Sequence, residues 1–210
     1  MDTTGFIIRH DPAGPVHTVA LTGPIAGGKS LALSFFKELG AETADADDVT
    51  HALYAPDGPL APALAAIFGP QVMAPDGSVD RKVLGRIVFS DPSARAVLET
   101  TTHPLIRERL LAWRDAVRAR DAIGIVAIPL LFESGMAADW DATACLVVPD
   151  EVLLPRLLAR GHSESEARAR LAAQLSPSEK AARADYWLRN DSTPLALRAS
   201  CAALLRHLQR

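Results

Sequence analysis

The feature that most constrains the fold of this chain is the sequence Gly-Pro-Ile-Ala-Gly-Gly-Lys-Ser at residues 23–30. It matches the pattern G-x-x-x-x-G-K-S, the phosphate-binding loop called Walker A, in which successive backbone N–H groups point at an anion. Glycines at both ends allow the tight turns, the lysine ammonium reaches the outer phosphates, and the serine hydroxyl can ligate Mg²⁺. The residues that we expect to hold a nucleoside triphosphate in this way are Gly23, Ile25, Ala26, Gly27, Gly28, Lys29, Ser30 and Leu31.

The residues on both sides of the loop follow the order that this motif requires. His17–Thr22 is a short run of strand-forming residues directly before the loop. Leu31–Leu39 has apolar residues at helical spacing, and Gly40 is placed to end that helix. A helix that begins at the loop adds its positive dipole end to the anion site. Strand, loop and helix together predict nucleotide binding, although they do not say what is done with the nucleotide.

Composition limits the other classes of function. The chain has 210 residues, 49% of them hydrophobic, which is enough for one substantial core with small inserted subdomains. A net charge of −3 gives no global basic field, so we expect neither a nucleic acid nor a membrane as partner. Cys145 and Cys201 match no metal-ligand spacing, which favours a reducing compartment and a cytoplasmic protein.

The first sixteen residues do not read as a signal peptide. Phe6–Ile8 is too short for the apolar region of such a peptide, and the acidic Asp2 precedes it. We expect residues 1–16 to form a loosely held extension. The longest apolar runs are far shorter than a membrane span, which predicts a soluble protein.

An acidic cluster follows the first strand–loop–helix. Residues 41–44 read as a short strand, and Asp45, Asp47 and Asp48 come directly after it. At the carboxyl edge of a parallel sheet, such carboxylates can serve as a ligand of metal-bound water and as a general base. The alternative is an acidic N-terminus for a helix that begins near Val49. Because a phosphate-binding loop is present, we favour a functional role for at least one aspartate.

Residues 56–121 contain no strong second parallel strand. Helical patterns are expected over residues 60–68, 81–89, 92–100 and 104–120, separated by turns. We therefore predict a helical subdomain for the acceptor substrate at about residues 50–120. His103 and Pro104 should open the long helix, with Pro104 at its first position. From the sequence, His103 is as well explained by a capping or core position as by a ligand contact.

Two further apolar runs, 122–128 and 143–148, are typical of strands buried on both faces. Many proteins with this phosphate loop carry an aspartate at the end of the third strand to hold the Mg²⁺ shell. Here that place is occupied by Ala127, Ile128 and Pro129. The metal shell must then use Ser30, water and another carboxylate, either Asp45 or Asp47.

A helical hairpin with arginines is predicted after these strands, at about residues 151–182. Arg156 and Arg160 are spaced to share one face of its first helix. Ser163 and Glu166 match a capping box that begins the second helix. Such a hairpin can close over a triphosphate and exclude water. An ordinary surface hairpin, with its arginines in salt bridges, is an equally good interpretation. A last short strand reaches Asn190, and an amphipathic helix over 195–209 closes the chain.

Taken together, the motifs resemble those of the dephospho-CoA kinase family. The resemblance runs from Thr18 to nearly the end of the chain. The Walker loop is common to many families, whereas the ordered set of the other motifs is specific. These are Asp45-Ala46-Asp47, Phe68-Gly69, Asp76-Gly77, Asp80-Arg81, Leu84, Val88-Phe89, His103-Pro104-Leu105-Ile106, Pro129-Leu130-Leu131-Phe132-Glu133, Arg156-Leu157, Arg160, Gln174 and Ala184-Asp185 followed by Asn190.

The chain departs from the family pattern at several positions. The family loop usually reads Gly-Ile-Gly-Ser-Gly-Lys-Ser-Thr, from which Ala26, Gly27 and Leu31 differ. Leu31 removes a hydroxyl, but Ser30 keeps the metal ligand. A glutamine usually stands where this chain has Leu153, and an arginine where it has His51. These differences affect single contacts and do not change the resemblance.

The resemblance implies a single α/β domain over residues 1–210 with the P-loop kinase fold. It implies a five-stranded parallel sheet flanked by helices, a helical acceptor-substrate subdomain and a helical lid. The implied reaction is ATP-dependent phosphorylation of the ribose 3′-hydroxyl of dephospho-CoA, the last step of coenzyme A synthesis. ATP and Mg²⁺ are the implied cofactors, and dephospho-CoA is the small-molecule partner.

Roles for the site residues follow from the chemistry of phosphoryl transfer. Asp47 would accept the proton of the 3′-hydroxyl and Asp45 would support the metal-water shell, although the two could exchange roles. Lys29 would hold the outer phosphates, and Arg156 and Arg160 would neutralise charge when the lid closes. The resemblance implies contacts for the remaining residues. Asn190 would lie near adenine, and the residues near the acceptor would be Arg81, His103, Pro129, Leu130 and Glu133.

Two other functions remain open from the sequence. One is a kinase for a different small hydroxyl acceptor, such as a nucleoside or a sugar. The other is a nucleotide-dependent switch that binds partners and hydrolyses slowly. The chain lacks an Asn-Lys-x-Asp guanine-reading motif, and an aspartate-rich strand end has no role in such a switch. We therefore favour the interpretation as a dephospho-CoA kinase over both alternatives.

Overall fold

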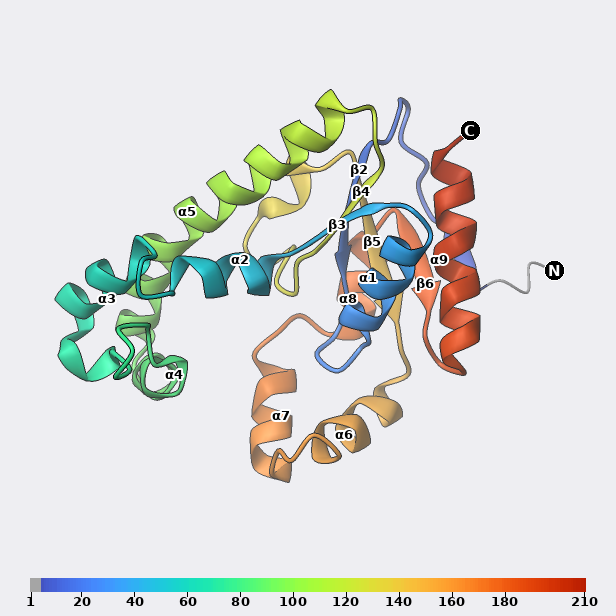
Figure 1. Ribbon diagram of the computed structural model, residues 1–210. Coiled ribbons are helices and arrows are strands. Elements are labelled where there is room, and N and C mark those ends of the chain that lie inside the picture. The colour runs from blue at the N-terminus through green and yellow to red at the C-terminus, as the bar shows by residue number, and fades with distance from the viewer. Residues whose placement is uncertain (1–4) are drawn as a thin grey trace. The chain divides into compact units, whose positions relative to one another are not determined.

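The computed structural model describes residues 5–210 of the chain (Figure 1). Backbone packing divides it into two compact units. The first unit contains the chain up to Asp45 together with Arg114–Arg210, and the second is the inserted segment Ala46–Trp113. Each unit has a hydrophobic core of its own.

The first unit is built on a six-stranded sheet in the order β1-β6-β5-β2-β4-β3. From β6 to β3 every neighbouring pair is parallel, and β1 adds an antiparallel edge beside β6. The prediction of a parallel five-stranded sheet is confirmed for these five strands, but the total of five is wrong because of β1. The strands are β1 (Phe6–Ile8), β2 (Thr18–Thr22), β3 (Glu42–Asp45), β4 (Gly124–Ala127), β5 (Ala142–Val147) and β6 (Tyr186–Arg189).

Helices cover both faces of this sheet. Helices α1 (Lys29–Glu38) and α9 (Pro194–Leu208) lie side by side and share one core cluster with the sheet (Figure 1). Successive residues of β5 point to opposite faces. Leu146 therefore joins the α1/α9 cluster, whereas Cys145 packs with residues at the end of α8 (Pro177–Arg183). The buried central strands explain the nearly continuous apolar runs in the sequence.

The segment before β2 is held more firmly than the sequence indicates. Phe6 is only 9% exposed, and its ring centroid lies 5.9 Å from that of Tyr186. Asp11 Oδ1 accepts a hydrogen bond from the Tyr186 hydroxyl at 3.0 Å and lies 2.8 Å from His207 Nε2. The prediction of a loosely held extension is therefore wrong for residues 6–11. Residues 1–4 of that prediction lie outside the described part of the chain.

The predicted helical hairpin after β5 consists of α6 (Asp150–Leu158) and α7 (Glu164–Ala172). We call these two helices and their turn the α6–α7 hairpin. The predicted capping box of Ser163 and Glu166 is present at the start of α7. A second capping box, of Ser176 and Glu179, begins α8. The same spacing of a serine and a glutamate is visible in the sequence.

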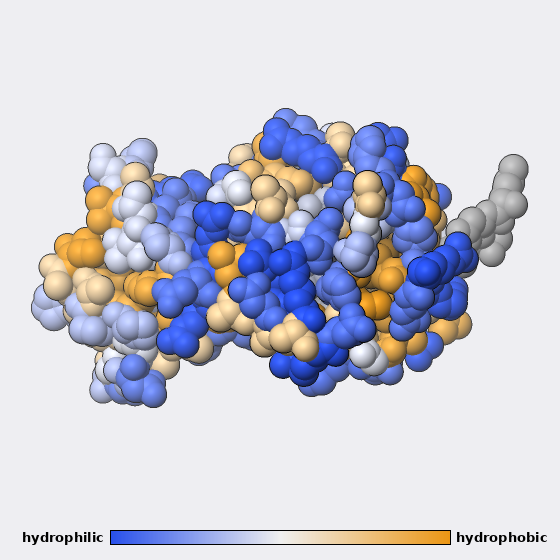
Figure 2. All heavy atoms as spheres, turned by 90° about the horizontal axis from the view of Figure 1, so that it is seen from above, coloured by the Kyte–Doolittle hydropathy of each residue, from blue (hydrophilic) through white to orange (hydrophobic). Residues whose placement is uncertain are grey.

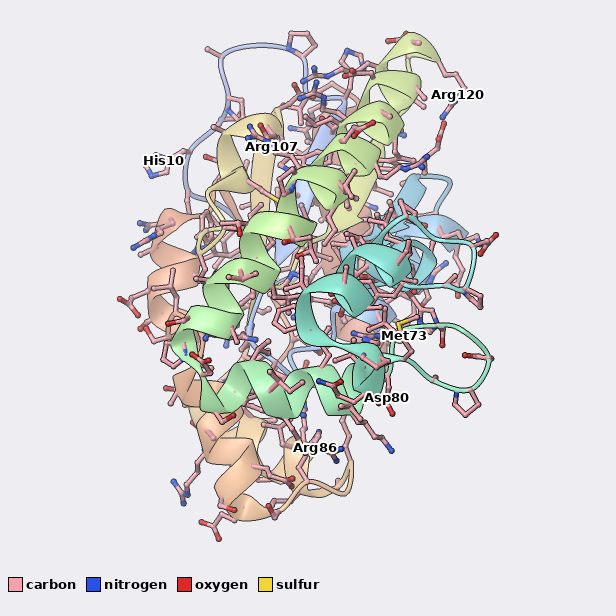
Figure 3. All side chains as sticks on the ribbon, turned by 90° about the vertical axis from the view of Figure 1, so that its left-hand side faces the viewer. His10, Met73, Asp80, Arg86, Arg107 and Arg120 are labelled. Carbon is pink, nitrogen blue, oxygen red and sulfur yellow. The ribbon has the colours of Figure 1, made fainter. Side chains whose placement is uncertain are left out.

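The second unit is entirely helical apart from one isolated bridge, within the residues that the structure describes. Its core contains Leu53, Leu60, Leu64 and Leu84. Asp80 caps α4, because its Oδ1 accepts from the backbone N–H groups of Lys82 and Val83 at 2.9 and 3.0 Å (Figure 3). The elements are α2 (Ala46–Leu53), α3 (Leu60–Phe68), the 3₁₀ turn η1 (Pro70–Val72), α4 (Arg81–Ser90) and most of α5 (Pro92–Ala119).

Helix α5 differs from the prediction. Residues 92–119 form one helix with Pro104 in its interior, so the expectation that His103 and Pro104 open a helix is wrong. A proline inside a helix removes one hydrogen bond at a cost of about 3 kcal/mol. Packing offsets this cost, because Leu98 on one side of Pro104 and Leu105 on the other both pack against the core of the second unit.

Hydrophobic residues also reach the surface of the second unit. Figure 2 shows them gathered over α3 and the neighbouring part of this unit. Ile67, Phe89 and Val97 are 45%, 67% and 42% exposed. In the described part of the chain, no helix is both long and apolar enough to cross a lipid bilayer.

Candidate active site

The phosphate loop lies between the central strand β2 and helix α1. It makes a turn in which the Gly27 N–H donates to the Pro24 carbonyl at 3.0 Å. Gly28 has a φ of 94° and directly precedes the first residue of α1. A Cβ at Gly28 would lie 2.4 Å from Asn190 Nδ2, and one at Gly27 would lie 2.7 Å from the Pro24 carbonyl oxygen. The glycines therefore supply both the positive φ and the close approach that the loop needs.

Lys29 and Ser30 begin α1 at the end of this loop. Lys29 Nζ donates to the carbonyl oxygens of Gly23 at 2.9 Å and Pro24 at 3.0 Å. The ammonium group thus binds the backbone of the phosphate loop in which it is predicted to hold a nucleotide. Ser30 and Leu31 are exposed at the helix N-terminus, where backbone N–H groups and the helix dipole favour an anion.

Asp45 is the last residue of β3 and is half-buried. It is in register with Ala127 on β4, which is in register with Leu21 on β2. Neighbouring strands lie about 4.8 Å apart, so Asp45 is about 10 Å from Leu21 along this row. The phosphate loop begins two residues after Leu21, which places Asp45 at the same edge of the sheet as the loop.

Asn190, directly after β6, contacts the phosphate loop. Its side chain is 7% exposed, and Nδ2 donates to the Gly27 carbonyl at 2.8 Å. Its backbone N–H donates to the Val147 carbonyl at 2.9 Å, which fixes it to the end of β5. The sequence singled out Asn190 only through the family resemblance, as a residue near adenine. The geometry shows a direct contact with the loop, which only the fold could reveal.

The α6–α7 hairpin contacts the loop through Arg156 and apolar side chains. Arg156 Nη1 donates to the Ala26 carbonyl and Nη2 to the Asn190 carbonyl, both at the long distance of 3.4 Å. Ala26 is buried and packs with Leu157 and Ala167 of the hairpin. Ala26, the loop and Arg156 are therefore brought together within the first unit.

Arg160 is placed differently from the prediction. Helix α6 ends at Leu158, so Arg160 lies in the turn that follows the helix and not within the helix, where the spacing predicts it. Its backbone N–H donates to the Leu157 carbonyl at 3.1 Å. Gly161, with a φ of 87°, follows it and ends the helix in the way that C-terminal glycines do. Arg160 is exposed.

The segment Pro129–Glu133 follows β4 and reaches the base of the phosphate loop. The Pro129 carbonyl accepts from the Thr22 hydroxyl at 3.3 Å, and Thr22 directly precedes Gly23. Glu133 Oε1 lies 3.0 Å from Lys180 Nζ and accepts from the Leu175 N–H at 3.0 Å. Leu130, in the turn between them, is half-buried. These contacts cannot be predicted from the sequence, because the partners are distant along the chain.

Three predicted site residues lie in the second unit. Asp47 is exposed in the first turn of α2, two residues after Asp45 in the chain. Arg81 begins α4, and its charge acts on Tyr54: burial raises the pKa of that phenol, and the guanidinium offsets part of the rise. His103 is exposed in the interior of α5. The structure places none of these three in the first unit with the loop.

Comparison with known proteins decides the family. The family model described as Dephospho-CoA kinase matches residues 17–195. The chain belongs to the dephospho-CoA kinase family. A dephospho-CoA kinase of Symbiobacterium thermophilum is 42% identical over 193 residues, which cover 90% of this chain and 80% of that protein. The family resemblance inferred from the sequence motifs is thereby confirmed.

Solved structures agree with this family and with the fold. The dephospho-CoA kinase from Campylobacter jejuni matches with a TM-score of 0.71 and 28% identity, over 91% of this chain and 96% of that chain. The protein TT1252 from Thermus thermophilus matches with a TM-score of 0.77 and 30% identity, over 93% of this chain and 99% of that chain. The predicted α/β P-loop kinase fold is therefore confirmed for this member of the family.

Proposed function

We propose that this chain phosphorylates the ribose 3′-hydroxyl of dephospho-CoA with ATP, giving coenzyme A and ADP. The hydroxyl oxygen forms a bond to the γ-phosphorus, and the bond from that phosphorus to the bridging oxygen of ADP breaks. The hydroxyl proton passes to a carboxylate of the enzyme. Such a transfer depends mainly on positioning and on neutralising charge.

One observation carries this proposal above the others. The phosphate loop is complete in its backbone, its lysine and its serine, and it lies within the 17–195 stretch that matches the kinase family. Loop N–H groups and Lys29 would hold the β- and γ-phosphates. Arg156 already contacts the loop, and with Arg160 it would add positive charge during the transfer.

The residues present fit a magnesium ion. Ser30 and Asp45 offer hard oxygen donors of the kind that Mg²⁺ prefers, and both belong to the first unit. Among residues 5–210, no group of three or more His, Cys, Asp or Glu side chains could hold a metal ion. This agrees with an ion bound by one or two protein oxygens, water and substrate phosphates. When bound, the ion would neutralise charge on the β- and γ-phosphates.

We assign the proton acceptor to Asp47 and the support of the metal-water shell to Asp45. The assignment rests on the motif, on the chemistry of carboxylates and on the place of Asp45 at the end of β3. The two aspartates could exchange these roles. Arg81, His103, Pro129, Leu130 and Glu133 are proposed to contact dephospho-CoA, on the strength of the family resemblance.

The first test is to mix the purified chain with Mg-ATP and dephospho-CoA. ADP release should require dephospho-CoA, and the product should gain the mass of one phosphoryl group. ADP formed without the acceptor would contradict the proposal and favour an ATPase. ADP formed only with a nucleoside or a sugar would favour the second kinase interpretation.

The second test uses neighbouring carboxylates in one helix. Asp47→Asn should lower turnover by about 10²- to 10⁴-fold, because a general base is lost, while ATP binding is kept. Asp48→Asn, an exposed neighbour in α2, is the matched control and should leave turnover within about twofold. Near-normal turnover of Asp47→Asn would remove Asp47 from the mechanism. If Asp45→Asn instead showed the loss at saturating Mg²⁺, the two roles would be exchanged.

A further inference from the structure

Lys180, in α8, has a fully buried side chain: its exposed fraction is 0%. A lysine is rarely buried unless its charge is paired, because removing an ammonium group from water is costly. Lys180 Nζ has three acceptors, the Pro129 carbonyl at 2.6 Å, Glu133 Oε1 at 3.0 Å and Gln174 Oε1 at 3.3 Å. All three protons of the ammonium group can therefore be used.

These acceptors come from two segments with predicted roles in the reaction. Pro129 and Glu133 belong to the turn after β4, which is proposed to contact the acceptor. Gln174 lies just beyond α7, at the C-terminal end of the α6–α7 hairpin. The Glu133 carboxylate also accepts from the Leu175 N–H, so it connects the turn to this end of the hairpin a second time.

The same group of contacts reaches the base of the phosphate loop. The Pro129 carbonyl accepts from Thr22 as well as from Lys180. Thr22 is in register with Cys145 on β5, and burial raises the pKa of the Cys145 thiol to about 12, although the ammonium groups of Lys180 and Lys29 oppose the rise. Lys180 thus lies at the carboxyl ends of the parallel strands, where open α/β folds bind their ligands.

The two ends of the α6–α7 hairpin are held by different kinds of contact: near the loop, Leu157 and Ala167 pack on the buried Ala26. Also near the loop, Arg156 makes two contacts of 3.4 Å, which are long for hydrogen bonds. The C-terminal end of the hairpin is fixed by the ion pair of the buried Lys180 with Glu133 and by the hydrogen bond from the Leu175 N–H to Glu133, both at 3.0 Å.

We propose that Lys180 is a positioning residue that fixes the Pro129–Glu133 turn and the C-terminal end of the α6–α7 hairpin to the end of β2. It acts through these groups and does not itself contact the reacting atoms. An apolar residue would fill the same space but would remove the ammonium donor from the Pro129 carbonyl and the Glu133 carboxylate, which would keep the Thr22 hydroxyl and the Leu175 N–H as donors. The proposal rests on the proposed function where its test uses the acceptor substrate.

The test compares Lys180→Met with a matched control, Thr143→Val. Thr143 is also buried in the first unit. It lies near the N-terminal end of β5, where its hydroxyl donates to Asp185 at 2.7 Å. For Lys180→Met we expect kcat/KM for dephospho-CoA to fall about ten- to hundredfold, since small misplacements have effects of this size. The Kd for ATP, measured without acceptor, should stay within about twofold. Thr143→Val should change neither by more than about twofold.

Equal losses of kcat/KM in both variants, or unchanged acceptor kinetics in folded Lys180→Met, would overturn the proposal. If Lys180→Met does not fold, Gln174→Met decides the question, because it removes one acceptor and leaves Glu133 and Pro129 in place. A rise in the KM for dephospho-CoA with unchanged ATP binding then supports the proposal, and no change overturns it.

A second readout does not depend on the acceptor. The Leu175 amide should exchange its hydrogen with solvent at least about tenfold faster in Lys180→Met than in wild type, and no faster in Thr143→Val. For Gln174→Met we expect the same direction with a smaller effect. If wild type fails to phosphorylate dephospho-CoA, the proposed function fails, whereas the exchange rates still decide the role of Lys180. Unchanged exchange at Leu175 would overturn that role even in an active enzyme.

Discussion

The side-chain amide of Asn190 donates to the carbonyl oxygen of Gly27 at 2.8 Å, although 163 residues separate the two along the chain. Asn190 follows β6 and Gly27 lies in the loop after β2, with β5 between these two strands in the sheet. A buried carbonyl that loses such a donor is left without its hydrogen bond, which costs about 1–3 kcal/mol. The contact therefore couples the shape of the phosphate loop to the last strand.

Asn190→Ala should lower the free energy of unfolding by about 1–3 kcal/mol and weaken ATP binding severalfold, because the Gly27 carbonyl loses its donor. Urea unfolding and calorimetric titration with ATP would measure the two effects. The control is Asp191→Ala, which removes a surface ion pair with the neighbouring Arg189 and should cost less than about 1 kcal/mol. Unchanged ATP affinity in Asn190→Ala would show that the loop keeps its shape without this contact.

Two glycines give opposite predictions for the same substitution. Gly28→Ala should destabilise the protein by more than about 1 kcal/mol and reduce ATP binding, because φ is 94° and the new Cβ would meet Asn190 Nδ2 at 2.4 Å. Gly85→Ala, in the interior of α4 with nothing within 4 Å of the new Cβ, should stabilise it by about 0.5–1 kcal/mol. Thermal unfolding of both variants checks the pair, and a stabilised Gly28→Ala would refute the argument from backbone geometry.

The parts of the fold that the sequence predicts are those set by neighbouring residues. The strand–loop–helix around Lys29 and the capping box of Ser163 depend on residues a few positions apart. The central parallel strands are visible because burial on both faces requires continuous apolar runs. The same local rules misplace a helix start at Pro104, since packing of Leu98 and Leu105 on one core overrides the cost of the proline.

The parts that the sequence does not predict depend on contacts between distant residues. The sequence around Phe6 predicts an extension, whereas the structure packs its ring against Tyr186. Nothing in the sequence distinguishes Lys180 from other helical lysines, but in the structure its ammonium group contacts Glu133 and Pro129. The spacing of Arg156 and Arg160 predicts one helix over both, whereas α6 ends two residues before Arg160. Pairing partners of this kind carry no periodic signal, so only the fold identifies them.

Ala26 shows why one departure from the family loop is tolerated. Its φ is 59°, in the left-handed region where a side chain costs about 1–2 kcal/mol relative to the right-handed region. Its methyl group is buried against Leu157 and Ala167, which recovers about 0.8 kcal/mol. Alanine also loses less backbone entropy on folding than glycine, by about 0.5–1 kcal/mol. The opposing terms nearly cancel, so alanine can replace the usual glycine here.

Asp141 predicts part of the acid sensitivity of the protein. Burial raises the pKa of its carboxyl group, but hydrogen bonds from Arg118 and from the Thr18 hydroxyl and N–H outweigh this and lower the pKa below 3.8. The unfolded chain therefore binds this proton more readily than the folded chain. The stabilisation of the fold by the Asp141 carboxylate is complete above about pH 5, and it is lost as the pH falls through the folded-state pKa. Urea unfolding of Asp141→Asn should show a shallower loss of stability between about pH 5 and pH 2 than wild type. Asp57→Asn, at an exposed position, should leave the wild-type slope unchanged, and an unchanged slope in Asp141→Asn would refute the assignment.

The antiparallel strand β1 should contribute to stability without contributing to the reaction. Phe6 is 9% exposed and packs against Tyr186 and His207, so Phe6→Ala should lower the free energy of unfolding by about 3 kcal/mol. Ile7 is adjacent in the same strand but 39% exposed, and Ile7→Ala should cost less than about 1 kcal/mol. Because β1 and β3 are at opposite edges of the sheet, kcat/KM at a temperature where both variants are folded should stay within about twofold of wild type. Equal destabilisation by the two substitutions would mean that strand pairing, and not the Phe6 ring, holds this segment in place.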